Sequence, residues 1–68
     1  MNGKEFTRRA RRLARRKGER FTVVSKRGKG GHQTAYFGRC FTTVKTGEIG
    51  IGLLRKMCRD LGIDPEDL

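Results

Sequence analysis

The sequence predicts an α+β fold in which two helices pack on one face of a three-stranded antiparallel sheet. Three observations predict it. Apolar residues recur at helical spacing near both ends of the chain. The middle of the chain alternates between apolar and polar residues, as a half-buried strand does. Between two such segments stands Gly38-Arg39, which has the length of a tight hairpin turn. The 68 residues form one domain, 1–68, with a thin core and no room for a deep substrate cavity.

The first helix is expected over residues 4–17. Its apolar stripe follows the spacing i, i+4, i+7, i+8 and consists of Phe6, Ala10, Leu13 and Ala14. Asn2 or Gly3 caps the start of this helix, and Gly18 ends it.

Arginine fills most of the remaining arc of this helix. The residues are Arg8, Arg9, Arg11, Arg12, Arg15 and Arg16. Only Glu5 opposes them within the helix. Like charges three or four residues apart repel one another by about 0.2–0.5 kcal/mol per pair. A helix that tolerates this repulsion indicates an anionic partner, and Arg8 and Arg12 are candidate RNA contacts. The same surface would also suit an acidic protein.

Three strands are expected, over residues 20–26, 32–37 and 40–45. Glycine at the first position of the Gly38-Arg39 turn favours type II′. This turn pairs His32 with Lys45. The core face then carries Ala35, Phe37, Cys40, Thr42 and Val44. The outer face carries His32, Thr34, Tyr36, Phe41, Thr43 and Lys45.

The last helix is expected from about Gly50 to Leu61, ended by Gly62. Its buried stripe consists of Leu53, Leu54, Met57, Cys58 and Leu61, while Arg55, Lys56, Arg59 and Asp60 face outward. Residues 64–68 are expected to form a short acidic tail. Cys40 and Cys58 show no metal-binding spacing and are expected to remain free thiols.

The charge of the chain restricts its partners. Seventeen Lys and Arg against seven Asp and Glu give a formal net charge of +10. A domain this basic is expected to bind nucleic acid or an acidic protein. The carboxylates are scattered, which disfavours a magnesium-dependent nuclease, so neither a metal nor a cofactor is expected. No apolar run approaches the length of a bilayer span, and no signal sequence is evident, so a cytoplasmic protein without a membrane partner is expected.

His32, the only histidine, follows the basic glycine-rich segment Arg27-Gly28-Lys29-Gly30-Gly31. Such a segment lets a polyanion approach the backbone closely, and an imidazole exchanges protons near neutral pH. RNA carries its own nucleophile, the 2′-hydroxyl, so one base and a few cations suffice to cleave it. The pattern predicts His32 as the general base or acid, and Lys29 and Lys45 as the phosphate-stabilising cations. The predicted RNA contacts of this site are Arg27, Lys29, Gly30, Gly31 and Lys45. A solvated histidine at the start of a strand is the alternative.

Several segments in this order resemble the HicA family of toxins from bacterial type II toxin–antitoxin systems. They follow the basic first helix and are Gly28-Lys29-Gly30-Gly31-His32, Tyr36-Phe37-Gly38-Arg39, Phe41-Thr42-Thr43-Val44-Lys45, Gly47-Glu48-Ile49, Gly52-Leu53-Leu54 and Leu61-Gly62-Ile63. The resemblance extends over nearly the whole chain.

This resemblance implies a fold like that of double-stranded-RNA-binding domains, in the order α-β-β-β-α. It implies a metal-independent endoribonuclease that cuts messenger RNA and thereby halts translation. The family's catalytic histidine falls on His32, and its antitoxin partner, HicB, is expected to cover that residue. Many members have serine where this chain has Gly31. The alternative is a non-catalytic module that reads double-stranded RNA through the first helix, residues 27–31 and the start of the last helix.

Overall fold

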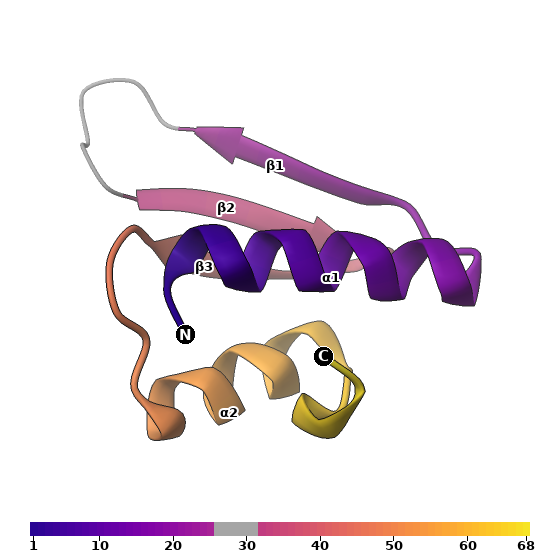
Figure 1. Cartoon of the computed structure of the whole chain (residues 1–68). Helices are drawn as coiled ribbons and strands as arrows, with labels where there is room; N and C mark the ends of the chain where they lie inside the picture. The colour runs from indigo at the N-terminus through magenta and orange to yellow at the C-terminus, as the bar shows by residue number, and fades with distance from the viewer. Residues whose placement is uncertain (26–31) are drawn as a thin grey trace.

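The computed structural model describes residues 1–25 and 32–68 and has the predicted order α-β-β-β-α (Figure 1). Its elements are α1 (Gly3–Lys17), β1 (Phe21–Ser25), β2 (His32–Phe37), β3 (Cys40–Lys45), α2 (Ile51–Leu61) and a final 3-10 turn, η1 (Pro65–Asp67). The strands form one antiparallel sheet in the order β1-β2-β3. Both helices lie on one side of it, as predicted, because the side chains of only one sheet face are buried.

Local capping sets the ends of α1. The side chain of Asn2 accepts a hydrogen bond of 2.8 Å from the backbone N–H of Glu5, so the helix begins at Gly3, one residue earlier than predicted. Gly18 ends it in the left-handed conformation, with φ 70°. The predicted apolar stripe of this helix is buried in full.

The β2–β3 hairpin has the predicted register. His32 pairs with Lys45, and Phe37 pairs with Cys40. Gly38 has φ 61°, whereas Arg39 is not among the positive-φ residues, which is the sign pattern of a type II′ turn. β1 is shorter than the predicted 20–26: it begins opposite Phe37 at Phe21 and is described to Ser25.

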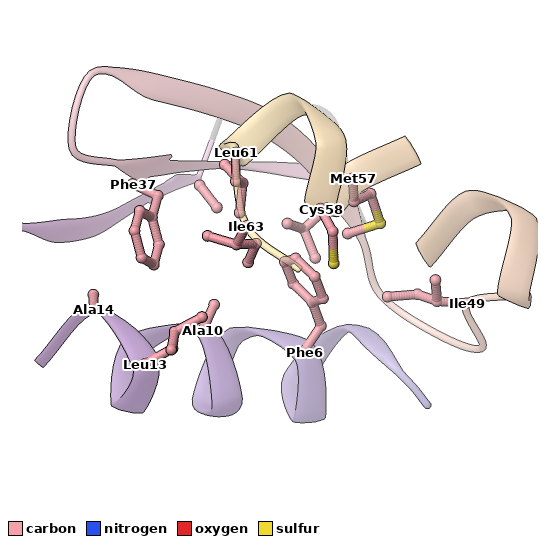
Figure 2. Close-up of a cluster of buried hydrophobic side chains, with 12 residues drawn as sticks. Phe6, Ala10, Leu13, Ala14, Phe37, Ile49, Met57, Cys58, Leu61 and Ile63 are labelled. Carbon is pink, nitrogen blue, oxygen red and sulfur yellow. The ribbon is translucent and has the colours of Figure 1, made fainter. Parts of the chain in front are cut away.

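The core lies between the sheet and the two helices. Figure 2 shows Phe6 pointing from α1 toward Cys58 and Ile63. Its buried hydrophobic residues are Phe6, Ala10, Leu13, Ala14, Ala35, Phe37, Val44, Ile49, Met57, Cys58, Leu61 and Ile63. Cys58 and the half-buried Cys40 are free thiols, as predicted.

One polar pair joins β3 to α2. Thr42 is buried on the core face, and its hydroxyl donates a hydrogen bond of 3.0 Å to the Asp60 carboxylate. The Lys56 ammonium donates to the same oxygen at 2.9 Å. Asp60 was predicted to face outward and is instead half-buried. The prediction was wrong because helical spacing does not reveal that a polar core residue needs a partner.

The start of the chain packs against the segment that leads from β3 to α2. The Gly3 N–H donates to the Gly47 carbonyl at 3.0 Å, and the Ile49 N–H donates to the Met1 carbonyl at 2.7 Å. Gly3 is buried, and a Cβ atom there would overlap the backbone carbonyl oxygen of Lys45. Glycine at this position therefore allows α1 to begin directly against the end of β3.

The predicted acidic tail, residues 64–68, folds back on the rest of the chain. Asp64 caps η1 by accepting a hydrogen bond of 2.9 Å from the Glu66 N–H. Leu68 packs against the core, and Arg16 of α1 donates to the Asp67 carbonyl at 3.0 Å. Within residues 1–25 and 32–68, no helix has the length and apolar character needed to cross a membrane.

Candidate nucleic-acid interface

His32 and Lys45 lie side by side at one end of the sheet. His32 is the first residue of β2 and Lys45 the last of β3, and they are direct cross-strand partners. Directly opposed residues share a sheet face with their Cβ atoms about 4.5–5.5 Å apart. Both side chains are exposed on the outer face, and no described residue forms an ion pair with either. An imidazole and an ammonium group are thus held next to each other and open to a ligand, as predicted.

Four of the predicted contacts lie outside the described residues. They are Arg27, Lys29, Gly30 and Gly31, which precede His32 in the sequence. Their assignment to the site remains a prediction.

Apart from Lys17, the charged residues of α1 form two parallel rows. The sheet-side row, which borders the sheet, consists of Lys4, Arg8, Arg11 and Arg15. The turn-side row, which borders the 3-10 turn η1, consists of Glu5, Arg9, Arg12 and Arg16. Each row follows the spacing i, i+4, i+7, i+11, which keeps its members on one stripe of a helix with about 3.6 residues per turn. The two predicted contacts are therefore divided: Arg8 is in the first row and Arg12 in the second.

The sheet-side row borders a cationic cleft between α1 and the ends of β2 and β3. This cleft has a volume of about 320 Å³ and is lined by Gly3, Lys4, Thr7, Arg8, Arg11, Gln33, Val44, Lys45 and Thr46. None of these lining residues is acidic. The Arg11 guanidinium lies over the Phe21 ring, 5.5 Å from its centroid, which fixes this charge at the margin of the sheet. The cleft has the charge and the polar groups that phosphate oxygens require.

The turn-side row faces acidic groups of the same chain. Glu5 forms ion pairs with Arg8 and Arg9, the latter at 2.6 Å between Nε and Oε2. The hydrogen bond from Arg9 holds the pKa of the Glu5 carboxyl below its ordinary value of 4.5. A second cleft is lined by Glu5, Arg8, Arg9, Arg12, Arg16, Glu66, Asp67 and Leu68.

The arginines of α1 therefore have more acidic neighbours than the sequence of the helix alone indicates. Glu66 and Asp67, near the C-terminal end of the chain, line the same cleft. Arg12 lines only this mixed-charge cleft, whereas Arg8 lines both. Of the two predicted contacts on α1, only Arg8 lines the same cleft as Lys45.

The cationic cleft and the predicted base do not converge on a single point. His32 lies on the outer face of the sheet, whereas the predicted contact Arg8 lines the cleft between α1 and the sheet. Lys45 connects the two regions, because it pairs with His32 and also lines the cationic cleft. A ligand that contacts both regions has to pass the end of β2 and β3.

Sequence reasoning missed Lys4 and Arg11 as candidate contacts. The signal was present in the spacing, because both residues share the helical row of Arg8. What the spacing lacks is the direction in which that row points, which depends on the packing of α1 against the sheet.

Among the described residues, no three His, Cys, Asp or Glu side chains gather in a way that could hold a metal ion. Comparison of the chain with protein-family models, with curated proteins and with solved structures found no match. A function must therefore be argued from the residues and geometry of this interface.

Proposed function

We propose that the chain is the toxin of a type II toxin–antitoxin system, a metal-independent endoribonuclease that cleaves messenger RNA in the cytoplasm. The observation that carries this proposal is the exposed His32–Lys45 pair at the edge of a cationic cleft without carboxylates. The resemblance of the sequence to the HicA family also supports it. A domain this basic was expected to bind either nucleic acid or an acidic protein. The proposed function includes both partners, because an antitoxin that blocks the toxin must bind the surface that RNA uses.

The chemistry requires only groups that this pair and the RNA supply. The neutral imidazole of His32 accepts the proton of a ribose 2′-hydroxyl. The freed oxygen attacks the adjacent phosphorus, and the bond to the 5′-oxygen of the next nucleotide breaks, leaving a 2′,3′-cyclic phosphate. Solvent protonates the departing 5′-oxygen. Lys45 stabilises the additional negative charge on the phosphate oxygens during this displacement, and Lys29 is the proposed second cation.

The partner proposed for this site is a HicB-type antitoxin that covers His32. An exposed base at the rim of the sheet is a site that a bound protein can block without changing the fold of the toxin. Substituting His32 is expected to leave such a complex intact, because the antitoxin would contact a wider surface than one ring.

The test is incubation of a long single-stranded RNA with the purified protein in excess chelator. The wild type is expected to cleave, and His32→Ala is expected to be slower by at least about 100-fold, the usual contribution of a general base. Arg55→Ala is the matched control, because it removes one exposed positive charge from α2 outside the cationic cleft. Undiminished cleavage by His32→Ala would refute the role of this residue.

A non-catalytic double-stranded-RNA-binding module is the second candidate. It is favoured by the placement of Lys4, Arg8 and Arg11 on a different side from His32. It predicts that RNA stays intact, that a gel shift disappears at high salt, and that His32→Ala binds like the wild type.

A further inference from the structure

The outer face of the sheet carries an aromatic pair that the proposed chemistry does not use. Tyr36 and Phe41 are cross-strand partners, with ring centroids 5.9 Å apart and ring planes inclined by 40°. Phe41 is 61% exposed and Tyr36 is 42% exposed. The other aromatic residues, Phe6, Phe21 and Phe37, belong to the core or pack against it. The two outer rings therefore lie on the exposed face of the sheet rather than in the interior.

The surroundings of this pair are polar and regularly spaced. The register places Thr22 beside Tyr36, and Thr34 beside Thr43. These side chains surround the rings with hydroxyl groups, and Val24 adds a further apolar contact at 46% exposure. The combination of exposed rings and hydroxyl groups suits a ligand that has both aromatic faces and hydrogen-bonding edges.

The charge around the pair favours an anion. None of the three described strands contains an Asp or Glu residue. Arg20 and Arg39 stand at the turn end of the sheet, where the Gly38 N–H donates to the Arg20 carbonyl at 2.8 Å. Lys45 stands at the other end. Two carboxylates of the described residues lie near this surface. One is that of Glu19, beside Gly38. The other is that of Asp60, which lines a cleft together with Phe41 and Lys45 and accepts a hydrogen bond from the Lys56 ammonium.

We infer that Tyr36 and Phe41 form a base-stacking platform for single-stranded RNA whose backbone passes His32 and Lys45. Every base has a flat π-face, so aromatic side chains hold unpaired bases with little dependence on sequence. Bases within a duplex are already stacked and are not free to lie on this pair. The platform therefore selects unpaired RNA as the substrate class. The inference rests on the proposed function, because it takes His32 as the position of cleavage.

Geometry fixes where the stacked bases lie relative to the cut. His32 and Tyr36 are four residues apart on β2, which is about 13 Å at the rise of an extended strand. This distance equals about four nucleotides at the rise of a stacked strand, and fewer if the RNA is extended. The platform thus stacks bases that lie within a few nucleotides of the scissile phosphate, while the phosphate itself lies at His32 and Lys45.

A protein partner fits this face less well than RNA. The apolar surface of a second copy or of another protein would cover Tyr36 and Phe41. It would, however, leave the threonine hydroxyls and the cations at both ends without partners. A polyanion with aromatic bases satisfies all of these groups together.

The experiment uses the whole chain with His32→Ala, so that binding is measured without cleavage. Tyr36 is the only tyrosine and the chain has no tryptophan, so intrinsic emission reports on the platform directly. We expect a short single-stranded RNA to quench this emission and to bind at least about 10-fold more weakly to Phe41→Leu. The same RNA annealed to its complement is expected to show neither effect.

Two matched variants accompany this measurement. Phe41→Tyr keeps an aromatic face and is expected to retain the affinity. Ile51→Ala removes a side chain that is 72% exposed on α2, outside the sheet, and is expected to leave RNA affinity unchanged. Equal losses in Ile51→Ala and Phe41→Leu would overturn the platform, as would single-stranded RNA binding that leaves the Tyr36 emission unchanged.

The platform and the proposed function fail in different ways. If His32 is required for cleavage but Phe41→Leu binds RNA normally, the ribonuclease stands and the platform falls. If Phe41→Leu weakens binding but the otherwise wild-type chain never cleaves RNA, the platform stands and the ribonuclease falls. If Phe41→Leu instead dissociates a self-association seen by sedimentation and leaves RNA affinity unchanged, the face is a contact between copies and the inference is wrong.

Discussion

Lys45 contacts two different elements, β2 through its pairing with His32 and the start of α1 through its backbone. Its side chain stands opposite His32, and its backbone carbonyl oxygen abuts Gly3 at the start of α1. Lys45 is thereby shared between the pair with His32 on the outer sheet face and the lining of the cationic cleft. Under the proposed function, this one residue would contact both the reacting phosphate and the RNA backbone beyond it.

Replacement of Lys45 tests the first of these roles. Lys45→Met keeps the length of the side chain and removes its charge, and it is expected to slow RNA cleavage by about 100-fold, the usual loss for one charge-stabilising donor. The measurement is the single-turnover rate at saturating protein, which separates chemistry from binding. Lys45→Arg is expected to recover most of the rate. Equal rates for Lys45→Met and wild type would remove Lys45 from the mechanism.

At the scale of the element, the two rows of α1 give neighbouring arginines different tasks. Arg11 of the sheet-side row lines the cationic cleft, whereas Arg12 of the turn-side row lies among Glu5, Glu66 and Asp67. Acidic neighbours offset the attraction of Arg12 for phosphate but not that of Arg11. Membership of a row, rather than the total charge of the helix, should therefore decide affinity for RNA.

Arg11→Ala and Arg12→Ala form the corresponding pair of variants. Arg11→Ala is expected to weaken RNA binding and to lower the slope of log K against log salt by about one, the value for one phosphate contact. Arg12→Ala is expected to change both quantities much less. Binding titrations over a range of salt concentrations measure them. A larger loss in Arg12→Ala would show that RNA uses the turn-side row.

Two helical glycines should respond oppositely to alanine. Gly3→Ala drives a Cβ atom into the Lys45 carbonyl and is expected to destabilise the fold, because backbone must move to accept it. At Gly52 in α2 a Cβ atom meets nothing within 4 Å. Gly52→Ala is expected to add about 0.5 kcal/mol to the free energy of unfolding, since alanine loses less backbone entropy. Denaturant unfolding of both variants measures the two changes, and a stabilised Gly3→Ala protein would contradict the close packing.

The elements were predictable because their signals are local. The spacing of Phe6, Ala10 and Leu13 predicts the buried face of α1, and Gly38 predicts the turn and with it the full β2–β3 register. The register in turn predicted that His32 and Lys45 would be partners. Each of these inferences needs only residues within a few positions of one another, or a single tight turn.

The remaining features depend on residues that meet only in the folded chain. Nothing near Asp60 in the sequence indicates that it receives the hydroxyl of Thr42. The docking of Asp67 on Arg16 joins residues 51 positions apart. The direction of the sheet-side row follows from the same kind of contact, so the division between Arg11 and Arg12 was not predictable from helical spacing.

At the scale of the whole molecule, two carboxylates link stability to pH. A hydrogen bond from Lys56, together with one from Thr42, lowers the pKa of Asp60 below its ordinary value of 3.8. Hydrogen bonding to Arg9 lowers that of Glu5 below 4.5. A carboxyl whose pKa is lower in the folded than in the unfolded state stabilises the fold at pH values above its pKa in the unfolded state. That contribution is lost as the pH falls through its pKa in the folded state.

The thermal midpoint of unfolding is therefore expected to fall as the pH is lowered from about 5 to about 2. Protonation of these carboxylates also raises a formal net charge that is already +10, so the repulsion within the folded chain grows in the same range. Asp60→Asn is expected to unfold at a lower temperature than the wild type at pH 6 and to show a shallower dependence on pH. Thermal melts of the two proteins between pH 6 and pH 2 measure both effects. Parallel curves would mean that Asp60 has the same pKa in the folded and unfolded chain, and would place the acid sensitivity of the fold in its net charge alone.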